Sequence, residues 1–317
     1  MNAKIKKKSQ RLSFVVDSPL VEKRLDQWLA TTDRSLSRTV IRKVIDLGGV
    51  HVNGRRVRKC SQALKRGDKI ELYRDQQPLT PFRLSEEDVL FRDDFLLVVN
   101  KPSGVESQPT PSRYKGTLYE ALLVFLKDPY RPLDKPELGM VQRLDRETSG
   151  AMIFSIHSRC HKPLTEAWQS HRVRKVYHAL VRDPGLDDEG EFISLLARNR
   201  RTNRMKSVAR GGKSAHTRYR VLKRLSGFAL VEIQLLTGRM HQIRVHFSEA
   251  GAPLLGDKLY GGTCCLGGQE ILRTMLHSFR LACDHPVDHK VVEFEAPRPH
   301  DFDSLLTRLE NNHDDVS

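Results

Sequence analysis

The sequence predicts an α+β protein, with a small N-terminal α/β domain followed by a larger domain that has a mixed, mainly antiparallel β-sheet and flanking helices. Three observations favour this fold. The chain of 317 residues is longer than one typical domain needs. Helical patterns and a hairpin signal share the first 75 residues, whereas strand patterns dominate from residue 141 onward. A stretch without periodicity lies between the two parts.

Two helices are expected in the N-terminal domain. Leu25, Trp28 and Leu29 repeat at i, i+3 and i+4, which is the period of a helix with one apolar face. Ser37, a residue type favoured at helix starts, precedes a second apolar stripe over residues 40–45. The two glycines that follow this stripe can supply the left-handed residue that ends the helix.

A hairpin comes next. Asn53-Gly54 is the strongest short hairpin signal, and valines alternate on both sides of it. A further strand is expected over residues 70–72. Basic side chains crowd the second helix and the hairpin, so a helix face and a β-turn can grip a nucleic-acid backbone together. The predicted RNA-binding residues here are Arg38, Arg42, Lys43, Arg55 and Arg56.

These patterns set the expected domain boundaries. The sequence predicts a basic tail over residues 1–19, a folded domain over 20–75, a linker over 76–87 and a second domain over 88–317. A capping-box spacing of Thr and Glu predicts a helix over the apolar stretch that follows it. The elements expected in the second domain are strands at 89–91, 95–99, 151–156, 174–181, 216–224 and 228–236, and helices at 121–126 and near 240–249.

The net charge of +15 is concentrated in two places. Residues 1–80 carry 19 basic and eight acidic side chains, and residues 198–224 carry eleven basic and no acidic ones, so the remainder is net acidic. A charge run is often only a solvated face, but two such regions in one chain favour a polyanion footprint. A membrane surface is the weaker alternative, because neither region has a continuous apolar helix face.

Composition excludes several classes of protein. The hydrophobic share of 38% is enough for a folded core, and no apolar run approaches the length of a membrane span. The lysine-rich start is not followed by the apolar stretch of a secretory signal. Five cysteines without a Cys-x-x-Cys pair favour a reducing compartment, so a cytoplasmic location is expected.

The segment 143–150 is the first candidate for chemistry. Asp145 lies between Arg143 and Arg146, and small polar residues follow. Positive neighbours keep an aspartate ionised, which suits a nucleophile or an electrostatic stabiliser better than a general acid. The alternative is a turn aspartate in surface ion pairs.

The segment 237–246 is the second candidate. It follows an alternating strand and passes through Thr-Gly into a predicted helix, whose start and two arginines, Arg239 and Arg244, favour an anion. We expect Arg244 to contact RNA. His241 and His246 are five residues apart, which is not the i, i+4 spacing of a helical zinc pair.

Tyr177 is the third candidate. It alternates with apolar residues in a predicted strand and by pattern alone is a core residue. Beside an ionised aspartate and an arginine, its hydroxyl can instead accept or donate a proton.

Two resemblances follow from these motifs. The pattern Arg24-Leu25-Asp26, Ser37-Arg38, residues 49–54 and Gly67-Asp68 resembles the RNA-binding domain named after ribosomal protein S4. The remainder resembles the RluA family of pseudouridine synthases, whose motifs R-L-D-x-x-T-S-G and T-G-R-x-H-Q-I-R-V-H match residues 143–150 and 237–246. The domain order is similar to that of the RluC and RluD branches.

The resemblance implies roles for four residues. Asp145 corresponds to the catalytic aspartate and Tyr177 to the active-site tyrosine. Arg239 corresponds to the basic residue that pairs with the aspartate, and Arg143 to the residue that fills the space of an extruded base. One departure is Gln142, which stands where family members commonly carry His.

The implied activity is isomerisation of specific uridines in RNA to pseudouridine, with large-subunit (23S) ribosomal RNA as the expected substrate. No cofactor, metal, membrane or obligate protein partner is expected. Three alternatives remain open: a synthase acting on tRNA, an RNA-binding ribosome-assembly factor without catalysis, and a glycosidase that hydrolyses the nucleoside bond. A zinc site of Cys264, Cys265, Cys283 and His285 is disfavoured, because adjacent cysteines lack the usual spacer.

Overall fold

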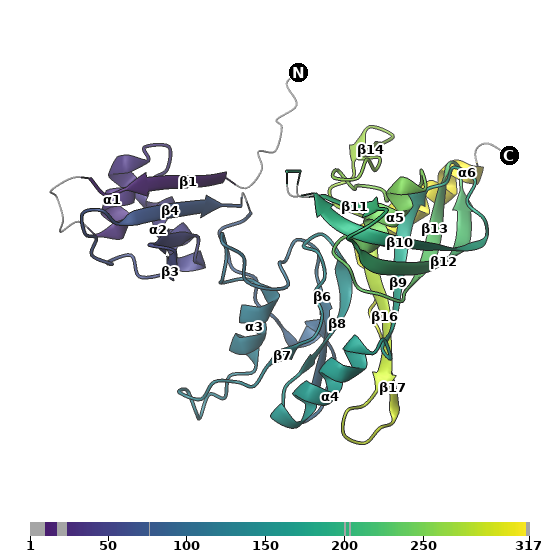
Figure 1. Ribbon diagram of the computed structural model, residues 1–317, viewed down its shortest axis with the longest axis horizontal. Helices are drawn as coiled ribbons and strands as arrows, with labels where there is room; N and C mark the ends of the chain where they lie inside the picture. The colour runs from purple at the N-terminus through teal and green to yellow at the C-terminus, as the bar shows by residue number, and fades with distance from the viewer. Residues whose placement is uncertain (1–9, 18–23, 76, 200, 203, 315–317) are drawn as a thin grey trace. The chain divides into compact units, whose positions relative to one another are not determined.

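The computed structural model describes residues 10–17, 24–75, 77–199, 201–202 and 204–314, which form two compact units (Figure 1). Unit 1 comprises residues 1–84 and 105–135, and unit 2 comprises 85–104 and 136–317. The segment 105–135 therefore belongs to the same compact unit as the N-terminal residues. This differs from the sequence-based boundaries, which place it in the second domain.

Unit 1 contains a four-stranded sheet in the order β1-β4-β2-β3. Part of the predicted basic tail is strand β1, because Leu12 and Phe14 alternate with polar residues and pack on the core of this unit. Residues 1–9 and 18–19 of that tail lie outside the described residues. The element bounds are β1 Gln10–Val15, α1 Leu25–Thr32, α2 Arg38–Leu47, β2 Val50–Val52, β3 Arg55–Val57, β4 Lys69–Arg74 and α3 Leu118–Phe125.

The predicted signals of the N-terminal elements are present. The Ser37 hydroxyl accepts a hydrogen bond from the Val40 amide at the start of α2, and Gly48 ends the helix with φ of 91°. Asn53 and Gly54 both have positive φ, 50° and 76°, as a tight hairpin of this type requires. These short-range expectations are confirmed.

The segment 105–135 is held to the rest of unit 1 by specific contacts. Arg113 makes two hydrogen bonds to Asp75, at 2.8 and 3.2 Å, and both side chains are largely buried. The amide of Tyr114 donates to the Leu47 carbonyl at 2.7 Å. The Tyr114 ring lies 4.6 Å from the guanidinium of Arg58.

Unit 2 is built on an eleven-stranded mixed sheet with the main order β11-β10-β12-β13-β9-β16-β8-β6-β5 (Figure 1). Among the described residues, β8 and β16 form its parallel pair and the other pairings are antiparallel. The predicted fold class is thus confirmed. The strands are β5 Val89–Arg92, β6 Leu96–Lys101, β7 Gly139–Met140, β8 Ser149–Ser155, β9 Arg174–Arg182, β10 Glu189–Asn199, β11 Arg204–Val208, β12 Lys213–Leu225, β13 Phe228–Leu235, β16 Leu276–Asp284 and β17 Val291–Glu295.

Helices cover both faces of this sheet. On β9, Tyr177 and Leu180 point to opposite faces because strand side chains alternate. Helix α6 (His300–Asp314) packs on the Leu180 face, and α5 (Gln242–Glu249) lies on the Tyr177 face, where Phe247 contacts Tyr219. The remaining elements are α4 (Ser158–Gln169), the 3-10 turn η1 (Glu86–Asp88) and a small hairpin of β14 (Cys265–Leu266) and β15 (Gln269–Glu270).

Two structural findings bear on function. Among the described residues, no helix is long and apolar enough to cross a membrane. Nor do three or more His, Cys, Asp or Glu side chains gather there in a way that could hold a metal ion.

Candidate active site

An ion pair between two residues that are far apart in the sequence forms the centre of the site in unit 2. Asp145 lies in the loop before β8, and Arg244 lies in the first turn of α5. Arg244 Nη1 donates to Asp145 Oδ2 at 2.9 Å. The Asp145 side chain is 23% exposed, so the carboxylate is held by the arginine and is still accessible.

Arg244 is held from behind by a second carboxylate. Its Nε and Nη2 atoms donate to the two oxygens of Asp257, at 2.6 and 2.8 Å, and Asp257 is fully buried. Burial alone lowers the pKa of Arg244, but the hydrogen bonds and charges of Asp257 and Asp145 outweigh it and raise the pKa. The guanidinium is therefore a permanent cation with only one nitrogen left for Asp145.

His241 approaches the same carboxylate from another side. Its Nε2 atom lies 3.6 Å from Asp145 Oδ2, and its Nδ1 atom lies 2.9 Å from the Tyr260 hydroxyl. That hydroxyl accepts a hydrogen bond from the Met205 amide, so its own proton can go to Nδ1. This arrangement favours the tautomer with its proton on Nε2, facing Asp145.

The local backbone explains one glycine of the matched motifs. Gly150 has φ of 116°, and a Cβ there would lie 2.2 Å from the Ser278 carbonyl oxygen, because β8 and β16 run close together at this point. The Ser149 hydroxyl forms a hydrogen bond of 2.9 Å with His277 Nδ1. The fully buried Lys101 donates to the Arg146 carbonyl at 3.3 Å, which fixes the residue after Asp145.

Tyr177 lies on β9 with its side chain buried. Burial raises the pKa of Tyr177 to about 12, with the negative charge of Asp145 adding to the shift and a hydrogen bond with Ser278 opposing it. The register of the sheet places Tyr177 opposite Ser278 on β16, and Ser278 opposite Gly150 on β8, so Tyr177 lies near the loop that carries Asp145. At neutral pH the group is a phenol, with roughly one molecule in 10⁵ ionised.

The predicted partner of Asp145 was Arg239, and here the structure differs. Arg239 Nε donates to the Ser214 carbonyl at 2.9 Å, and Arg244 makes the ion pair instead. The cause is local: His241 has φ of 53°, so α5 begins at Gln242 and residues 237–241 form a turn. The sequence pattern predicts a helix near 240–249 that begins before His241. The turn at His241 instead changes the directions of the Arg239 and Arg244 side chains relative to that helix.

Two further residues of this segment were singled out by sequence. Arg143 is exposed, and the described residues offer its side chain no hydrogen-bond or ion-pair partner. Gln142 is buried, and its Nε2 atom has no hydrogen-bond partner among the described residues.

The five basic residues predicted in unit 1 fall into two groups. Arg38 donates two hydrogen bonds to the fully buried Asp26, and Arg56 donates to the Thr110 carbonyl, so both hold the fold together. Arg42, Lys43 and Arg55 are exposed, with side chains that have no partner among the described residues. The sequence could not separate the groups, because the partners lie far along the chain.

Three residues of the site were missed as functional by sequence. Asp257 and Tyr260 lie in a loop after α5, where no sequence pattern assigns them a role. For His241 the sequence suggests only metal binding, which its spacing from His246 disfavours. Its left-handed φ is visible only in three dimensions.

Comparison with known proteins identifies the family. Residues 95–249 match the model of RNA pseudouridylate synthases, and residues 23–70 match the S4 domain. An RNA pseudouridine synthase of Aquifex aeolicus is 34% identical, over 96% of this chain and 98% of its own length. This chain belongs to the RNA pseudouridine synthase family. Ribosomal large subunit pseudouridine synthase D of Haemophilus ducreyi is 30% identical over 95% of each chain.

Solved structures agree on the fold. Human RNA Pseudouridylate Synthase Domain Containing 4 superposes with a TM-score of 0.59 at 24% identity, over 71% of this chain and 93% of its own. Human RNA Pseudouridylate Synthase Domain Containing 1 gives 0.53 at 27% identity, over 70% and 94%. The protein is thus an RNA pseudouridine synthase, an enzyme that isomerises uridine in RNA, with an S4-type RNA-binding domain.

Proposed function

We propose that Asp145 is the catalytic aspartate of this synthase. The observation that supports the assignment is the Asp145–Arg244 ion pair, in which a partly exposed carboxylate is held by an arginine that is itself locked in place. The reaction breaks the bond between N1 of uracil and C1′ of ribose and joins C5 to the same carbon. The proton on C5 leaves and N1 gains one, so no oxidant or cofactor is needed.

Asp145 acts on the ribose while the uracil departs, either by attack on C1′ or by removal of a ribose proton. In either case Arg244 holds the carboxylate in place by a hydrogen bond of 2.9 Å, and His241 Nε2 lies 3.6 Å from the same oxygen. Asp257 is a positioning residue, because it touches Arg244 and not the reacting carboxylate. Preorganised charges of this kind stabilise a transition state without moving.

Tyr177 takes part in uracil packing and in removal of the C5 proton. Because the pKa of Tyr177 is about 12, its use as a base at neutral pH costs about 7 kcal/mol of ionisation. That step should therefore become faster as pH rises.

Arg143 fills the space of the extruded uridine. Its exposed side chain is free to enter the RNA, as that role requires. Extrusion costs a few kcal/mol of stacking, which phosphate contacts from the basic surfaces offset. Arg42, Lys43 and Arg55 supply such contacts from unit 1.

Large-subunit (23S) ribosomal RNA is the proposed substrate, acted on in the cytoplasm. The support is the likeness to ribosomal large subunit pseudouridine synthase D over nearly the whole chain, together with the S4 domain.

Hydrolysis by a pair of carboxylates is less well supported. A glycosidase needs a second free carboxyl group across the bond. Glu147 accepts hydrogen bonds from the amide and hydroxyl of Thr274, and Asp257 is saturated by Arg244 and two backbone amides. Asp257 is therefore not available to activate water, and one oxygen of the Glu147 carboxylate is already engaged by Thr274.

The experiment is to map pseudouridines in ribosomal and transfer RNA from cells that carry wild-type protein or Asp145→Asn. We expect defined large-subunit sites to lose the modification in the variant. Loss only from tRNA would overturn the substrate assignment. Unchanged modification at every site would refute the role of Asp145, and an assembly defect alone would favour the assembly-factor alternative.

A further inference from the structure

The basic run 198–224 divides into two halves in the structure. The cations of its second half all pair with acids of unit 2, at distances of 2.7 to 3.2 Å. The pairs are Arg218 with Glu191, Arg220 with Glu232, Lys223 with Glu310, and Arg224 with Asp183 and Asp188. Exposed pairs of this kind are ordinary surface interactions.

The first half is different. It surrounds β11, the edge strand, and the turns that join it to β10 and β12. Five exposed cations there have side chains without a hydrogen-bond or ion-pair partner in the described part of the chain, which excludes Arg200. We call these residues the basic tip: Arg201, Arg204, Lys206, Arg210 and Lys213.

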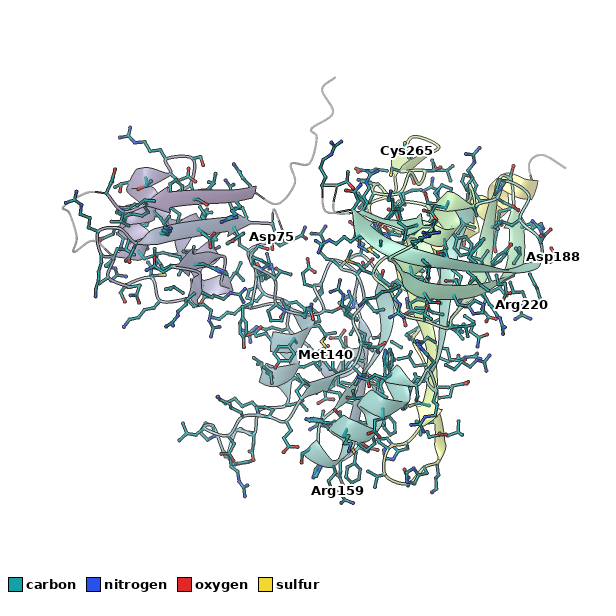
Figure 2. All side chains as sticks on the ribbon, viewed as in Figure 1. Asp75, Met140, Arg159, Asp188, Arg220 and Cys265 are labelled. Carbon is teal, nitrogen blue, oxygen red and sulfur yellow. The ribbon has the colours of Figure 1, made fainter. Side chains whose placement is uncertain are left out.

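The two halves lie at opposite ends of the same strands. Strand β10 lies between β11 and β12, and the start of β12 pairs with the end of β10 that also pairs with β11. From there β12 runs toward Arg220 and Asp188, which lie at the far end (Figures 1 and 2). Neighbouring cations without acids repel one another, which weakens the folded state. A polyanion relieves that repulsion and releases its own counterions.

The tip is connected to the active site by hydrogen bonds. Met205, between Arg204 and Lys206, donates from its amide to the Tyr260 hydroxyl at 2.9 Å. The same hydroxyl contacts His241, which faces Asp145. Strand side chains alternate, so Arg204 and Lys206 point to the face of β11 opposite to Met205. Because β11 is the edge strand, an RNA strand that leaves the active site reaches these two cations by crossing that edge.

Other uses of the tip fit less well. The edge of β11 is not free to add a strand, because the amides of Met205 and Ser207 already bond to Tyr260 and Glu249. A membrane surface would need apolar residues among the cations. Met205 is instead packed in the core with Val245.

We propose that the basic tip binds phosphates of the RNA strand next to the target uridine. This rests on the proposed function, and it assigns the first half of the basic run to substrate binding and the second half to the fold. Glu249 of α5 accepts hydrogen bonds from the amide and hydroxyl of Ser207, so it lies on the face of β11 opposite to Arg204 and Lys206.

Two matched triple variants test the proposal. One carries Arg201→Gln, Arg204→Gln and Lys206→Gln; the control carries Arg218→Gln, Arg220→Gln and Lys223→Gln. Each loses two arginines and one lysine, so the change in net charge is the same. The readout is the affinity for a uridine-rich single-stranded RNA, measured by fluorescence anisotropy over a range of salt concentrations.

The slope of log K against log salt is negative, and each phosphate contact on a single strand contributes about −0.7 to it. We expect the slope of the tip variant to be shallower than that of the wild type by about 2, since three cations are removed. The control should keep the wild-type slope. Equal slopes in both variants, an unchanged slope in the tip variant, or a wild-type protein that does not bind this RNA would each overturn the proposal.

Activity separates this test from that of the proposed function. Release of tritium from RNA labelled at uracil C5 reports isomerisation by the wild type. If the wild type binds but releases no label, the proposed function fails while the binding result stands. If it releases label, the tip variant should raise KM more than it lowers kcat.

Discussion

Two buried carboxylates, one in each unit, hold arginines in the same way and with different results. Asp26 in unit 1 accepts from Arg38 and Arg24, whose side chains are 47% and 44% exposed. Asp257 in unit 2 accepts two hydrogen bonds from Arg244, which is 10% exposed and reaches Asp145 with its third nitrogen.

The difference shows what makes an anchored arginine functional. In unit 1 the hydrogen-bond network ends at Asp26, and its two arginine partners offset the free-energy cost of burying the carboxylate. Burial by itself raises the pKa of Asp26, but the hydrogen bonds and charges of Arg38 and Arg24 prevail and lower it. In unit 2 the network continues to a carboxylate that substrate can reach, so the same kind of pair prepares a reactive group.

The largest expected effect concerns the group beside that carboxylate. We expect Tyr177→Phe to slow tritium release by about 10²–10⁴-fold, the usual contribution of proton transfer by a positioned group. In the wild type the rate of the C5 step should rise about tenfold per pH unit from about pH 7 to 9, because the pKa of Tyr177 is about 12. A flat profile with activity retained in the Phe variant would leave Tyr177 as a packing residue only.

A second test breaks the anchor in unit 2. Asp257→Asn removes the charge that orients Arg244, and a misplaced catalytic group costs about 10²-fold in kcat. Single-turnover tritium release at saturating RNA measures this. The matched control is Asp26→Asn, the same substitution at the structural carboxylate, for which we expect kcat close to wild type; equal losses in the two variants would contradict the comparison.

A third test uses the effect of low pH on the stability of unit 2. Burial lowers the pKa values of His178 and His277 in unit 2 to about 4. Below about pH 6.5 these two histidines become protonated in the unfolded chain but stay neutral in the folded one. The free energy of unfolding therefore falls as pH decreases toward 4, by about 3 kcal/mol for each histidine.

Fluorescence of the two tryptophans can follow this, since Trp168 lies in unit 2 and Trp28 in unit 1. Denaturant unfolding of a Trp28→Phe variant should show the acid loss through Trp168. A stability of unit 2 that is constant from about pH 6.5 to 4 would disagree with neutral buried histidines.

The smallest expected effect is on unit 1. Asp26→Asn should cost about 1–3 kcal/mol, because the two arginines left behind are half exposed and can take up water. Unfolding followed through Trp28 in a Trp168→Phe background measures it. A loss seen equally through Trp168 would mean that Asp26 does not act within its own unit.

Sequence predicted what depends on neighbouring residues. The Ser37 and Gly48 ends of α2, the Asn53-Gly54 turn and the strand around Tyr177 are local signals, and all three match the structure, although β9 is buried on both faces. The elements that the sequence does not predict include helices α4 and α6 and strands β1, β10, β11, β16 and β17. Pro163 lies inside α4, and every residue of β16 but the last is at least partly shielded from solvent.

The site shows the same limit. Asp145 and Tyr177 came from recognisable motifs, but the choice between Arg239 and Arg244 depends on the left-handed backbone of His241. The anchor of Arg244 is 13 residues further along, in a loop whose fold is set by Gly256, where a Cβ would meet the Arg273 carbonyl at 1.8 Å. No periodicity in the sequence encodes such a contact.

The most direct test of the central claim compares two arginines of one motif. Arg244→Gln and Arg239→Gln are assayed for single-turnover tritium release at saturating RNA, with melting temperatures as the control for folding. We predict that Arg244→Gln loses about 10²–10³-fold, since it removes a donor from the reacting carboxylate, and that Arg239→Gln loses less than about tenfold. The reverse order would contradict the assignment of Arg244 as the partner of Asp145.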